Sequence, residues 1–503
     1  MVINVLAAAL LALGVLTAPD VATRPPIMSP QMSPAASGSW TAPATIWSSP
    51  QSAGAPANLT QVVDSQGRVT ALWSVSARSA IRVMSSRFDG RSWSKAARIG
   101  TAPLDPNGPH LRLAVGPTDE VVAAWATSAG SHVRVGAARF SGGSWGPPTS
   151  LGDQPGRVLQ SLALAADDSG VSAIWQVAPY FGAGTGALTV RGLPRGATSW
   201  TPATVLDDAA ATVPASVVRD GPGTTRAVWV SGASIVSAQG SATSWGAHET
   251  LGASTPPATS LAAAADESGN VLAAWLSPLS VGVPWVVTAA QHSVSGWAAP
   301  TTALTDSSWG AASVVMTSIG AGMPPTIVVS HVSPKADPIR EFLSWSGTAW
   351  TSVQQAFDDP VQSSGTPFAV GGAMVTLDVV GNCSLVVCQR ATTSWLSSKI
   401  VSGASVSPAA RVSGPAKAVI TGFAGLGTAD GSVVAVFGKS PAKGSAGVWS
   451  ARYTAGAWSA PTVVSKARRT SAKAFPATPV SAADGTVTLA WLSGRNVIVS
   501  RSR

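Results

Sequence analysis

The fold is decided by residues 56–100, which read PANLTQVVDSQGRVTALWSVSARSAIRVMSSRFDGRSWSKAARIG. Four runs rich in apolar, β-branched or aromatic residues alternate with turn residues in this stretch. They cover residues 59–63, 69–75 and 81–88, and the last run opens at Trp93. Short runs of this kind, bounded by Asp-Gly and Gly-Ser signals, are typical of antiparallel strands joined by hairpins. The stretch therefore predicts one small four-stranded sheet.

Tryptophan repeats along the chain with a period of about 50 residues, the signature of a repeat fold. One series precedes the last strand of each unit: Trp40, Trp93, Trp145, Trp200, Trp245, Trp297, Trp350, Trp395 and Trp458. The other lies in the second strand: Trp73, Trp125, Trp175, Trp229, Trp275 and Trp491, with Phe437 in the equivalent place. Thin sheets that can bury their faces only against their neighbours predict an all-β, single β-propeller of four-stranded blades.

The second-strand position predicts nine repeats, centred on Trp73, Trp125, Trp175, Trp229, Trp275, Val328, Thr376, Phe437 and Trp491. The last unit has only three strands before the chain ends, whereas residues 40–46 form an unmatched fourth strand. We expect this N-terminal strand to complete the last blade and close the ring, which would leave no exposed sheet edge. Because propellers usually have four to eight blades, an eight-bladed ring with one unit outside it is the alternative.

Three segments differ in composition. Residues 1–18 contain an apolar run with the length of a secretory signal peptide, although no Lys or Arg precedes it; a retained anchor is the alternative. Residues 19–38 are rich in Pro and Ser and predict a linker, and residues 39–503 carry the repeats. No later run is long and apolar enough to span a membrane as a helix. We therefore expect a secreted, extracellular protein.

Charged residues make up only 11% of the chain, and the formal net charge is +9. The Lys and Arg residues are scattered, with the densest group at Lys466, Arg468 and Arg469, and no nucleic-acid-binding motif is present. The sequence therefore predicts no nucleic-acid partner. Cys383 and Cys388 flank a β-type run, whose extended backbone and odd spacing predict that the two do not bond to each other.

Gly and Trp recur together before the fourth strand, as in Gly90 with Trp93 and Gly142 with Trp145, and again near Trp350 and Trp458. This pattern resembles the Asp-box of sialidase-type propellers in degenerate form, because Phe or another aromatic residue stands where that motif has Asp. The whole repeat also resembles Trp-rich propellers secreted by bacteria and tandem-repeat propeller lectins. A sialidase site would imply three clustered Arg, a Tyr nucleophile paired with Glu, and an acidic Asp.

Little else in the sequence supports that chemistry. The chain has two Tyr, of which Tyr453 occupies a repeated aromatic position and Tyr180 lies in a loop. The acidic residues lie mostly in turns, where Asp stabilises the backbone, and the five His show no metal-binding spacing. We expect no catalytic residue, no metal and no cofactor.

Two sets of residues are candidates for ligand binding. Arg87, Arg139 and Arg452 each precede an aromatic residue in the third strand, and Gln239, Gln291 and Gln389 take the same place elsewhere. They would form a ring of donors, although stacking on neighbouring rings is the interpretation we favour. The second set lies outside both Trp series and comprises Trp47, Trp285, Trp309 and Trp449. These could stack on sugar rings or fill gaps in irregular blades.

The sequence thus predicts a secreted, non-catalytic binding or scaffold protein. Its partner would be a glycan or a protein at the cell surface. A sialidase-like glycoside hydrolase is the alternative, and it requires paired carboxyl groups.

Overall fold

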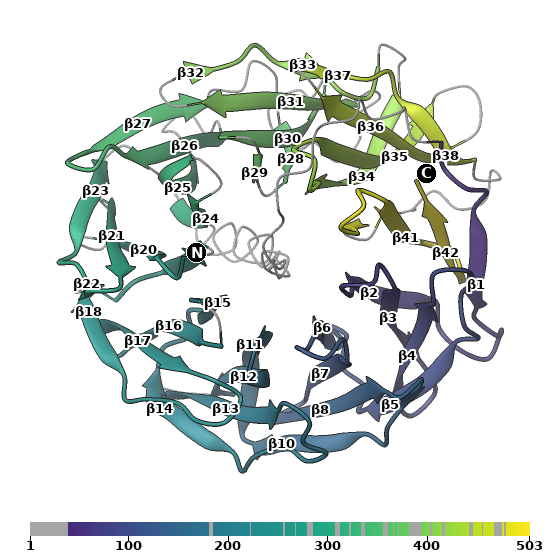
Figure 1. Ribbon diagram of the computed structural model, residues 1–503, viewed down its shortest axis with the longest axis horizontal. Coiled ribbons are helices and arrows are strands. Elements are labelled where there is room, and N and C mark those ends of the chain that lie inside the picture. The colour runs from purple at the N-terminus through teal and green to yellow at the C-terminus, as the bar shows by residue number, and fades with distance from the viewer. Residues whose placement is uncertain are drawn as a thin grey trace, which may run out of the picture.

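The computed structural model describes residues 39–502 except 181–184, 222, 255–256, 267, 279–284, 307–311, 321–322, 333–337, 356–360, 366, 371, 382–393, 403–404, 415–417, 442–445, 455, 467–474 and 477–478. In this part of the chain the regular elements are strands, and they form antiparallel sheets arranged around a central axis (Figure 1). In most of these sheets the first strand lies nearest the axis and the later strands lie further out (Figure 1). The protein is an all-β propeller.

The first sheets come from the N-terminal half. One comprises β2 (Pro56–Val63), β3 (Val69–Ser76), β4 (Ile81–Phe88) and β5 (Ala97–Ala102). The next comprises β6 (His110–Val115), β7 (Val121–Ala129), β8 (His132–Ser141), β9 (Ser144–Trp145) and β10 (Thr149–Pro155). An eight-stranded sheet follows, with β11 (Arg157–Asp167), β12 (Gly170–Pro179), β13 (Gly186–Pro194), β14 (Thr204–Ala210), β15 (Ser216–Arg219), β16 (Thr225–Ser231), β17 (Ser234–Gly240) and β18 (Glu249–Ala253).

The following sheets come from the C-terminal half of the chain. They are β19 (Ser260–Ala265), β20 (Val271–Pro278), β21 (Trp285–Ser293), β22 (Gly296–Trp297) and β23 (Thr301–Asp306), then β24 (Ala312–Gly320), β25 (Met323–Val332), β26 (Pro338–Trp345) and β27 (Trp350–Gln355). The next has β28 (Val361–Ser364), β29 (Phe368–Val370), β30 (Ala373–Gly381), β31 (Ser394–Ser402), β32 (Ser405–Val406) and β33 (Ala410–Arg411). It is followed by β34 (Ala418–Gly427), β35 (Val433–Pro441), β36 (Gly447–Thr454), β37 (Ala457–Trp458) and β38 (Thr462–Lys466).

The last sheet contains both ends of the described chain. It has β39 (Phe475–Pro476), β40 (Val480–Ser481), β41 (Val487–Ser493) and β42 (Asn496–Arg501), and β1 (Ala44–Ser48) pairs antiparallel with β42. Thr45 stands opposite Ile498, and a further bridge joins Trp40 to Ser502. Residues from the start of the chain therefore form the outer edge of the last sheet (Figure 1).

The eight-stranded sheet holds two of the sequence repeats. Its halves, β11–β14 and β15–β18, are joined by the single pair Ala210 and Ser231. Trp175 lies in one half and Trp229 in the other, and each is almost fully buried. The two repeats thus keep separate hydrophobic positions within one hydrogen-bonded sheet.

The second-strand Trp side chains fill the spaces between neighbouring sheets. Trp125 packs with Ile81 and Val83 of the preceding sheet in one buried cluster. Gly100, in the outer strand of that preceding sheet, faces the six-membered ring of Trp125 so closely that a Cβ there would clash. Gly152 stands in the same way beside Trp175 of the next sheet. A glycine in the fourth strand therefore makes room for the indole that locks the following sheet in place.

Two features differ from the sequence prediction. Trp93 does not open the fourth strand: it forms an isolated bridge with Phe88, and β5 begins at Ala97. Trp395 was assigned to the series before the fourth strand, but it lies in the third strand, β31, opposite Val380. The reason is that β30 and β31 pair at this position, which the period alone could not reveal. Cys383 and Cys388 lie outside the described residues, so the prediction about their bonding stays a prediction.

Candidate functional site

The three candidate arginines lie on third strands, and each points to an acidic residue in or beside the first turn of its own sheet. The pairs and their shortest N to O distances are Arg87 with Asp64 at 2.5 Å, Arg139 with Glu120 at 3.9 Å, and Arg452 with Asp430 at 2.8 Å. The acidic residues also accept hydrogen bonds from the turn, as Asp64 does from the backbone N–H groups of Gln66 and Arg68. Each arginine therefore forms an ion pair with an acidic residue at a turn of its own sheet.

Arg87 makes the most extensive contacts of the three. Its side chain is buried, donates to Thr70 Oγ1 over 2.6 Å, and lies with Cζ 4.8 Å from the centre of the Phe140 ring in the next sheet. Burial lowers the pKa of Arg87, while the negative charge of Asp64 opposes that shift. The guanidinium is thus saturated by the protein and joins two sheets, which is the stacking role expected from its position.

The fourth repeat obtains the same contacts from a different strand. Gln239 takes the third-strand position and donates to Asp220 over 3.3 Å. Beside it, Arg226 on β16 donates to Asp220 over 2.7 Å and lies 5.5 Å from the centre of the Trp297 ring in the next sheet. The remaining candidate at this position in the seventh unit, Gln389, lies outside the described residues.

The Trp residues outside the two series pack between sheets rather than gathering at one site. Trp47 lies against Trp73, with ring centres 6.0 Å apart, and Trp285 packs on the cluster formed by β20 and β25. Trp449 packs on another inter-sheet cluster and lies 5.1 Å from the Lys439 ammonium. Trp309 lies outside the described residues. The structure does not bring the described members of this set together.

A different location stands out because an aliphatic residue takes the arginine position there. In three sheets the third strand ends in Arg followed by an aromatic residue, namely Arg87–Phe88, Arg139–Phe140 and Arg452–Tyr453, and the aromatic residue pairs with the Trp after the turn, as Phe140 pairs with Trp145. Other third strands carry Gln239, Gln291 or Ser344 there. In the sheet β28–β33 the corresponding pair is Val401 with Val406. Ile400, directly before Val401, therefore occupies the arginine position. A short aliphatic side chain here leaves the next sheet's aromatic pair uncovered.

That aromatic pair is Tyr453 with Trp458, whose ring centres lie 5.5 Å apart at an angle of 52°. A cavity of about 390 Å³ opens between it and the outer strands of the preceding sheet, lined by Ser398, Ile400, Ser407, Pro408, Ala410, Arg411, Tyr453, Gly456, Ala457 and Trp458. Within the described residues, the indole N–H of Trp458 has no hydrogen-bond partner. The cavity is thus lined by two aromatic side chains together with Ser, Pro and Arg411 side chains.

The charge beside this cavity is positive. Arg411 Cζ lies 4.8 Å from the centre of the Trp395 ring, which holds the guanidinium beside the opening. Its charge also contributes to a lowered pKa of Lys439, of which burial is the main cause. Lys439 Nζ is held by the Ser413 carbonyl at 2.9 Å. The described lining residues include no Asp or Glu, and Arg411 is exposed.

The described residues do not assemble the sialidase arrangement. Tyr180 is 39% exposed at the end of β12, and the buried carboxylates of Asp64, Asp220 and Asp378 are each held by an arginine between 2.5 and 3.2 Å away. Within the same residues, no group of three His, Cys, Asp or Glu side chains is close enough to hold a metal ion. The described part of the chain also has no helix of the length and apolarity required to cross a membrane.

Comparison with known proteins finds similarity to solved structures and none to a family or a curated sequence. No family model matches the chain, and no curated protein matches its sequence. Among solved structures, a prolyl endopeptidase is similar with 12% identity and a TM-score of 0.38 over 79% of this chain; the match spans 55% of the peptidase, about half its length. The Trypanosoma rangeli sialidase has 9% identity and a TM-score of 0.30, covering 71% of this chain and 56% of its own. The SapL1 lectin, solved with alpha methyl fucoside, has 11% identity and a TM-score of 0.31, covering 61% and 98% respectively.

These structural neighbours are β-propeller proteins, and they include enzymes as well as lectins. At these identities and TM-scores the likeness favours neither binding nor catalysis for this chain.

Sequence reasoning missed the cavity because it treated Tyr453 and Trp458 as structural members of the repeat, and they do form the repeated pair. The signal was the residue that precedes the aromatic position at the end of the third strand. When the third strand of the seventh unit is aligned on β31, Ile400 stands where three other third strands have Arg. The cavity lies where the seventh repeat, which lacks this arginine, packs against the eighth repeat, which keeps the Tyr453 and Trp458 pair.

Proposed function

We propose that the protein is a non-catalytic glycan-binding propeller, and that it binds through the cavity between β31 and β36. The observation that carries this proposal is the Tyr453 and Trp458 pair, which faces a cavity instead of a guanidinium. Sugar rings have apolar faces that stack on aromatic side chains and hydroxyl groups that need polar partners at their edges. Ser398, Ser407 and Arg411 supply such partners around the two rings.

The cavity has the dimensions of a small-ligand site. Its volume of about 390 Å³ lies at the lower end of the range for such pockets, roughly 300 to 1,000 Å³. This size favours one or two sugar units over a protein surface, because protein partners generally cover wider and flatter areas. Arg411 further favours a sugar that carries a carboxylate or sulfate group, since an arginine can bind such a group through two parallel hydrogen bonds.

The same proposal includes the finer architecture. We propose a ring of nine blades closed by β1, in which β11–β14 and β15–β18 are two blades. The weak junction between those halves and the antiparallel pairing of β1 with β42 support this count and this closure. We further propose that the protein acts outside the cell, where its glycan would be displayed on a cell or matrix surface.

A glycan array tests the function. Wild-type protein and a Trp458→Ala variant are labelled and compared, with Trp350→Ala as the matched control, because Trp350 belongs to an equivalent ring pair with Trp345 on another sheet. We expect the wild type and Trp350→Ala to bind the same glycans and Trp458→Ala to lose them. Equal binding by all three proteins would place the glycan site elsewhere, and silence of the folded wild type would refute glycan binding.

A further inference from the structure

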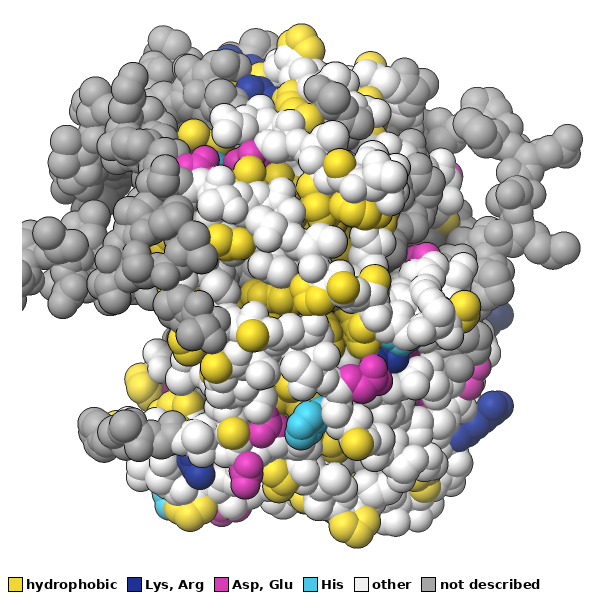
Figure 2. Space-filling view, turned by 90° about the vertical axis from the view of Figure 1, so that its left-hand side faces the viewer, with side chains coloured by type: hydrophobic (Ala, Val, Ile, Leu, Met, Phe, Trp, Pro, Cys, Tyr) yellow, Lys and Arg dark blue, Asp and Glu magenta, His cyan; other side chains and the backbone are white. Residues whose placement is uncertain are grey.

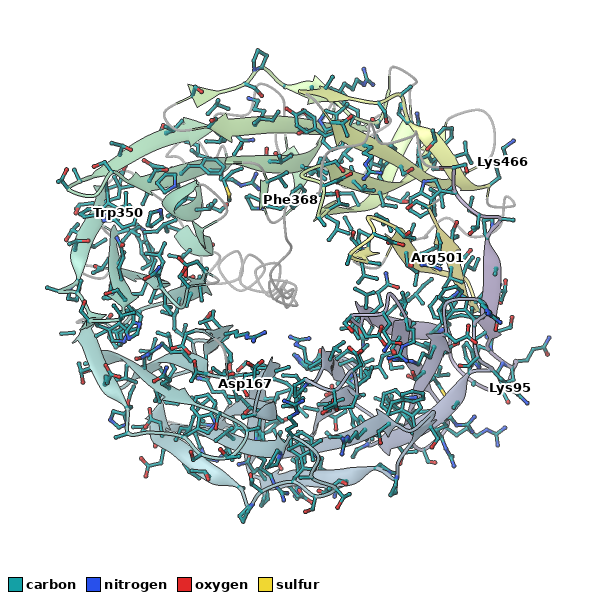
Figure 3. All side chains as sticks on the ribbon, in the orientation of Figure 1. Lys95, Asp167, Trp350, Phe368, Lys466 and Arg501 are labelled. Atoms are coloured by element: carbon teal, nitrogen blue, oxygen red, sulfur yellow. The ribbon has the colours of Figure 1, made fainter. Side chains whose placement is uncertain are left out.

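A concentration of exposed positive charge lies on the sheet β2–β5. Its members, which we call the basic strip, are Arg78, Arg82, Arg91, Lys95 and Arg98. All five are exposed, and Figure 3 shows Lys95 on the outer rim of the ring. Among the described residues, none of the five forms an ion pair with a carboxylate. Asp89, in the turn beside Arg91, is the acidic residue within the segment that carries the strip.

The strip follows the two outer strands of the sheet. Arg98 on β5 stands opposite Met84, which is two residues from Arg82 on the same face of β4, so Arg82 and Arg98 are about 7 Å apart along the strand. Lys95 follows Ser94, whose N–H bonds to the Arg87 carbonyl, about 10 Å further along. Arg78 and Arg91 lie in the turns at the two ends of β4. The positive charges therefore form a line.

In the neighbouring sheet the arginine that corresponds to Arg82 is neutralised by a carboxylate. Arg134 on β8 lies six residues before Phe140, as Arg82 lies six residues before Phe88. Asp153 stands opposite Arg134, at 3.3 Å, and also contacts His132 at 3.2 Å. The hydrogen bond from His132, together with the charge of Arg134, lowers the pKa of Asp153. Thr101 stands opposite Arg82 and offers no charge.

Apart from Asp89, the sequence around the basic strip adds no negative charge that would neutralise its cations. The adjoining residues 39–55, which include β1, contain no Asp or Glu. Figure 2 shows the side that carries β18 to β23, where the described Lys and Arg side chains are few and scattered. In a chain with only 11% charged residues, five unpaired cations along one edge are a local concentration that packing does not require.

We infer that the basic strip binds an acidic polysaccharide, as a surface separate from the cavity between β31 and β36. A spacing of about 7 to 10 Å separates successive cations along the outer strands of the strip. It suits a linear polymer with a carboxylate or sulfate on each sugar or each second sugar. The strip also lacks an exposed aromatic platform for bases, since Trp93 beside it is half-buried and stacked with Phe88 at 5.7 Å.

Binding to polygalacturonate at low salt tests the inference, with dextran as the uncharged polymer and short duplex DNA as the phosphate polymer. The variants are Arg82→Gln and a triple variant, Arg82→Gln with Lys95→Gln and Arg98→Gln. The matched control is Arg134→Gln, which removes the same charge from the neutralised position. Thr101→Asp adds the opposing carboxylate that Asp153 supplies in the next sheet. All substitutions lie on the surface, and circular dichroism checks that each variant is folded.

We expect wild type to bind polygalacturonate and not dextran, with affinity that falls as salt rises. The triple variant should bind at least about tenfold more weakly and with a smaller salt dependence, because fewer counterions are released. Arg82→Gln and Thr101→Asp should each weaken binding more than Arg134→Gln does. Equal weakening by Arg82→Gln and Arg134→Gln would show a response to net charge alone and overturn the inference. Tighter binding to DNA than to polygalacturonate, or no binding by the wild type, would also overturn it.

Discussion

The guanidinium of Arg87 lies 4.8 Å from the centre of the Phe140 ring, across the boundary between the sheets β2–β5 and β6–β10. The same contact recurs at other boundaries, where Arg501 lies 4.2 Å from the Phe88 ring centre and Arg226 lies 5.5 Å from that of Trp297. A cation on one sheet thus repeatedly covers an aromatic ring on the next. Where the cation is absent, at Ile400, a cavity takes its place.

Replacing Arg87 should strongly destabilise the protein. In Arg87→Met the Asp64 carboxylate, whose side chain is fully buried, keeps only its contact with Arg68 and its turn hydrogen bonds. Breaking one partner of a buried ion pair costs about 3 to 5 kcal/mol, so we expect a loss near the lower figure in urea unfolding. The double variant Asp64→Asn with Arg87→Met should recover part of that loss. A change in Arg87→Met no larger than that of exposed Arg134→Met would contradict the role assigned to this pair.

Two buried Trp residues differ in one hydrogen bond. Trp229 Nε1 donates to Asp207 over 2.6 Å, whereas Trp73 Nε1 has no hydrogen-bond partner among the described residues. Trp229→Phe and Trp73→Phe remove the same ring volume, so their difference reports the hydrogen bond to the carboxylate. We expect Trp229→Phe to lower the free energy of unfolding by about 1.5 to 3 kcal/mol more than Trp73→Phe does. Equal losses in chemical denaturation would show that Asp207 contributes nothing through this bond.

Stability should fall between pH 7.5 and pH 5.5. Burial lowers the pKa of both His110 and His292 below the ordinary value of 6.5, and the charge of Arg226 lowers that of His292 further. The unfolded chain therefore binds protons that the folded protein excludes, so the stability contributed by these groups is present above pH 6.5 and is lost as the pH falls. We expect the free energy of unfolding measured in urea to decrease over this range. His110→Gln should reduce this loss, and a stability that rises on acidification would contradict the assignment.

The pairing of the two chain ends can be fixed covalently. Thr45 and Ile498 stand opposite each other in β1 and β42, and opposite residues of antiparallel strands have Cα atoms about 4.5 to 5.5 Å apart, within the range for a disulfide. Thr45→Cys with Ile498→Cys, in a chain with Cys383 and Cys388 replaced by Ser, should form a bridge on mild oxidation. We expect the oxidised protein to melt at a higher temperature than its reduced form. Failure of the folded protein to form the bridge would argue against closure by β1.

Much of the fold could be predicted because it rests on local patterns. The run 81–88 is β4, and the turn acids bind their own backbone, as Asp266 does through the N–H groups of Ser268 and Asn270. The second-strand Trp residues lie between sheets as their period indicates. These features depend on residues close together in sequence, for which hairpin chemistry and side-chain size are sufficient.

The irregular units could not be predicted in the same way. Val328 was taken as the sixth Trp position, yet it packs toward Met374 of the following sheet, while Val329 packs toward the preceding one. In the seventh unit Asp378, and not Thr376, reaches back to Arg340 of the preceding sheet, at 3.2 Å. A shift of one residue turns a strand's side chains to the opposite face, and only the pairing with a neighbour fixes that register.

The candidate site depended on the same missing information. Arg87 could be placed on an aromatic ring in general terms, but which ring it covers depends on the contact between two sheets. Successive exposed cations from Arg78 to Arg98 are three to nine residues apart in sequence and show no motif along the chain. Pairing of β4 with β5 brings them to one edge. Contacts between sheets, rather than motifs along the chain, define both proposed binding surfaces.

The most direct test of the account is to fill the cavity with the arginine that three other sheets carry at this position. Ile400→Arg restores the repeated arginine and should place a guanidinium over Tyr453, as Arg87 lies over Phe140. Binding of the wild type and of Ile400→Arg to the same glycan array, with melting temperatures recorded for both, is the measurement. The account predicts that Ile400→Arg stays folded, melts at or above the wild-type temperature and loses the glycans that the wild type binds. Undiminished glycan binding by a folded Ile400→Arg protein would contradict it.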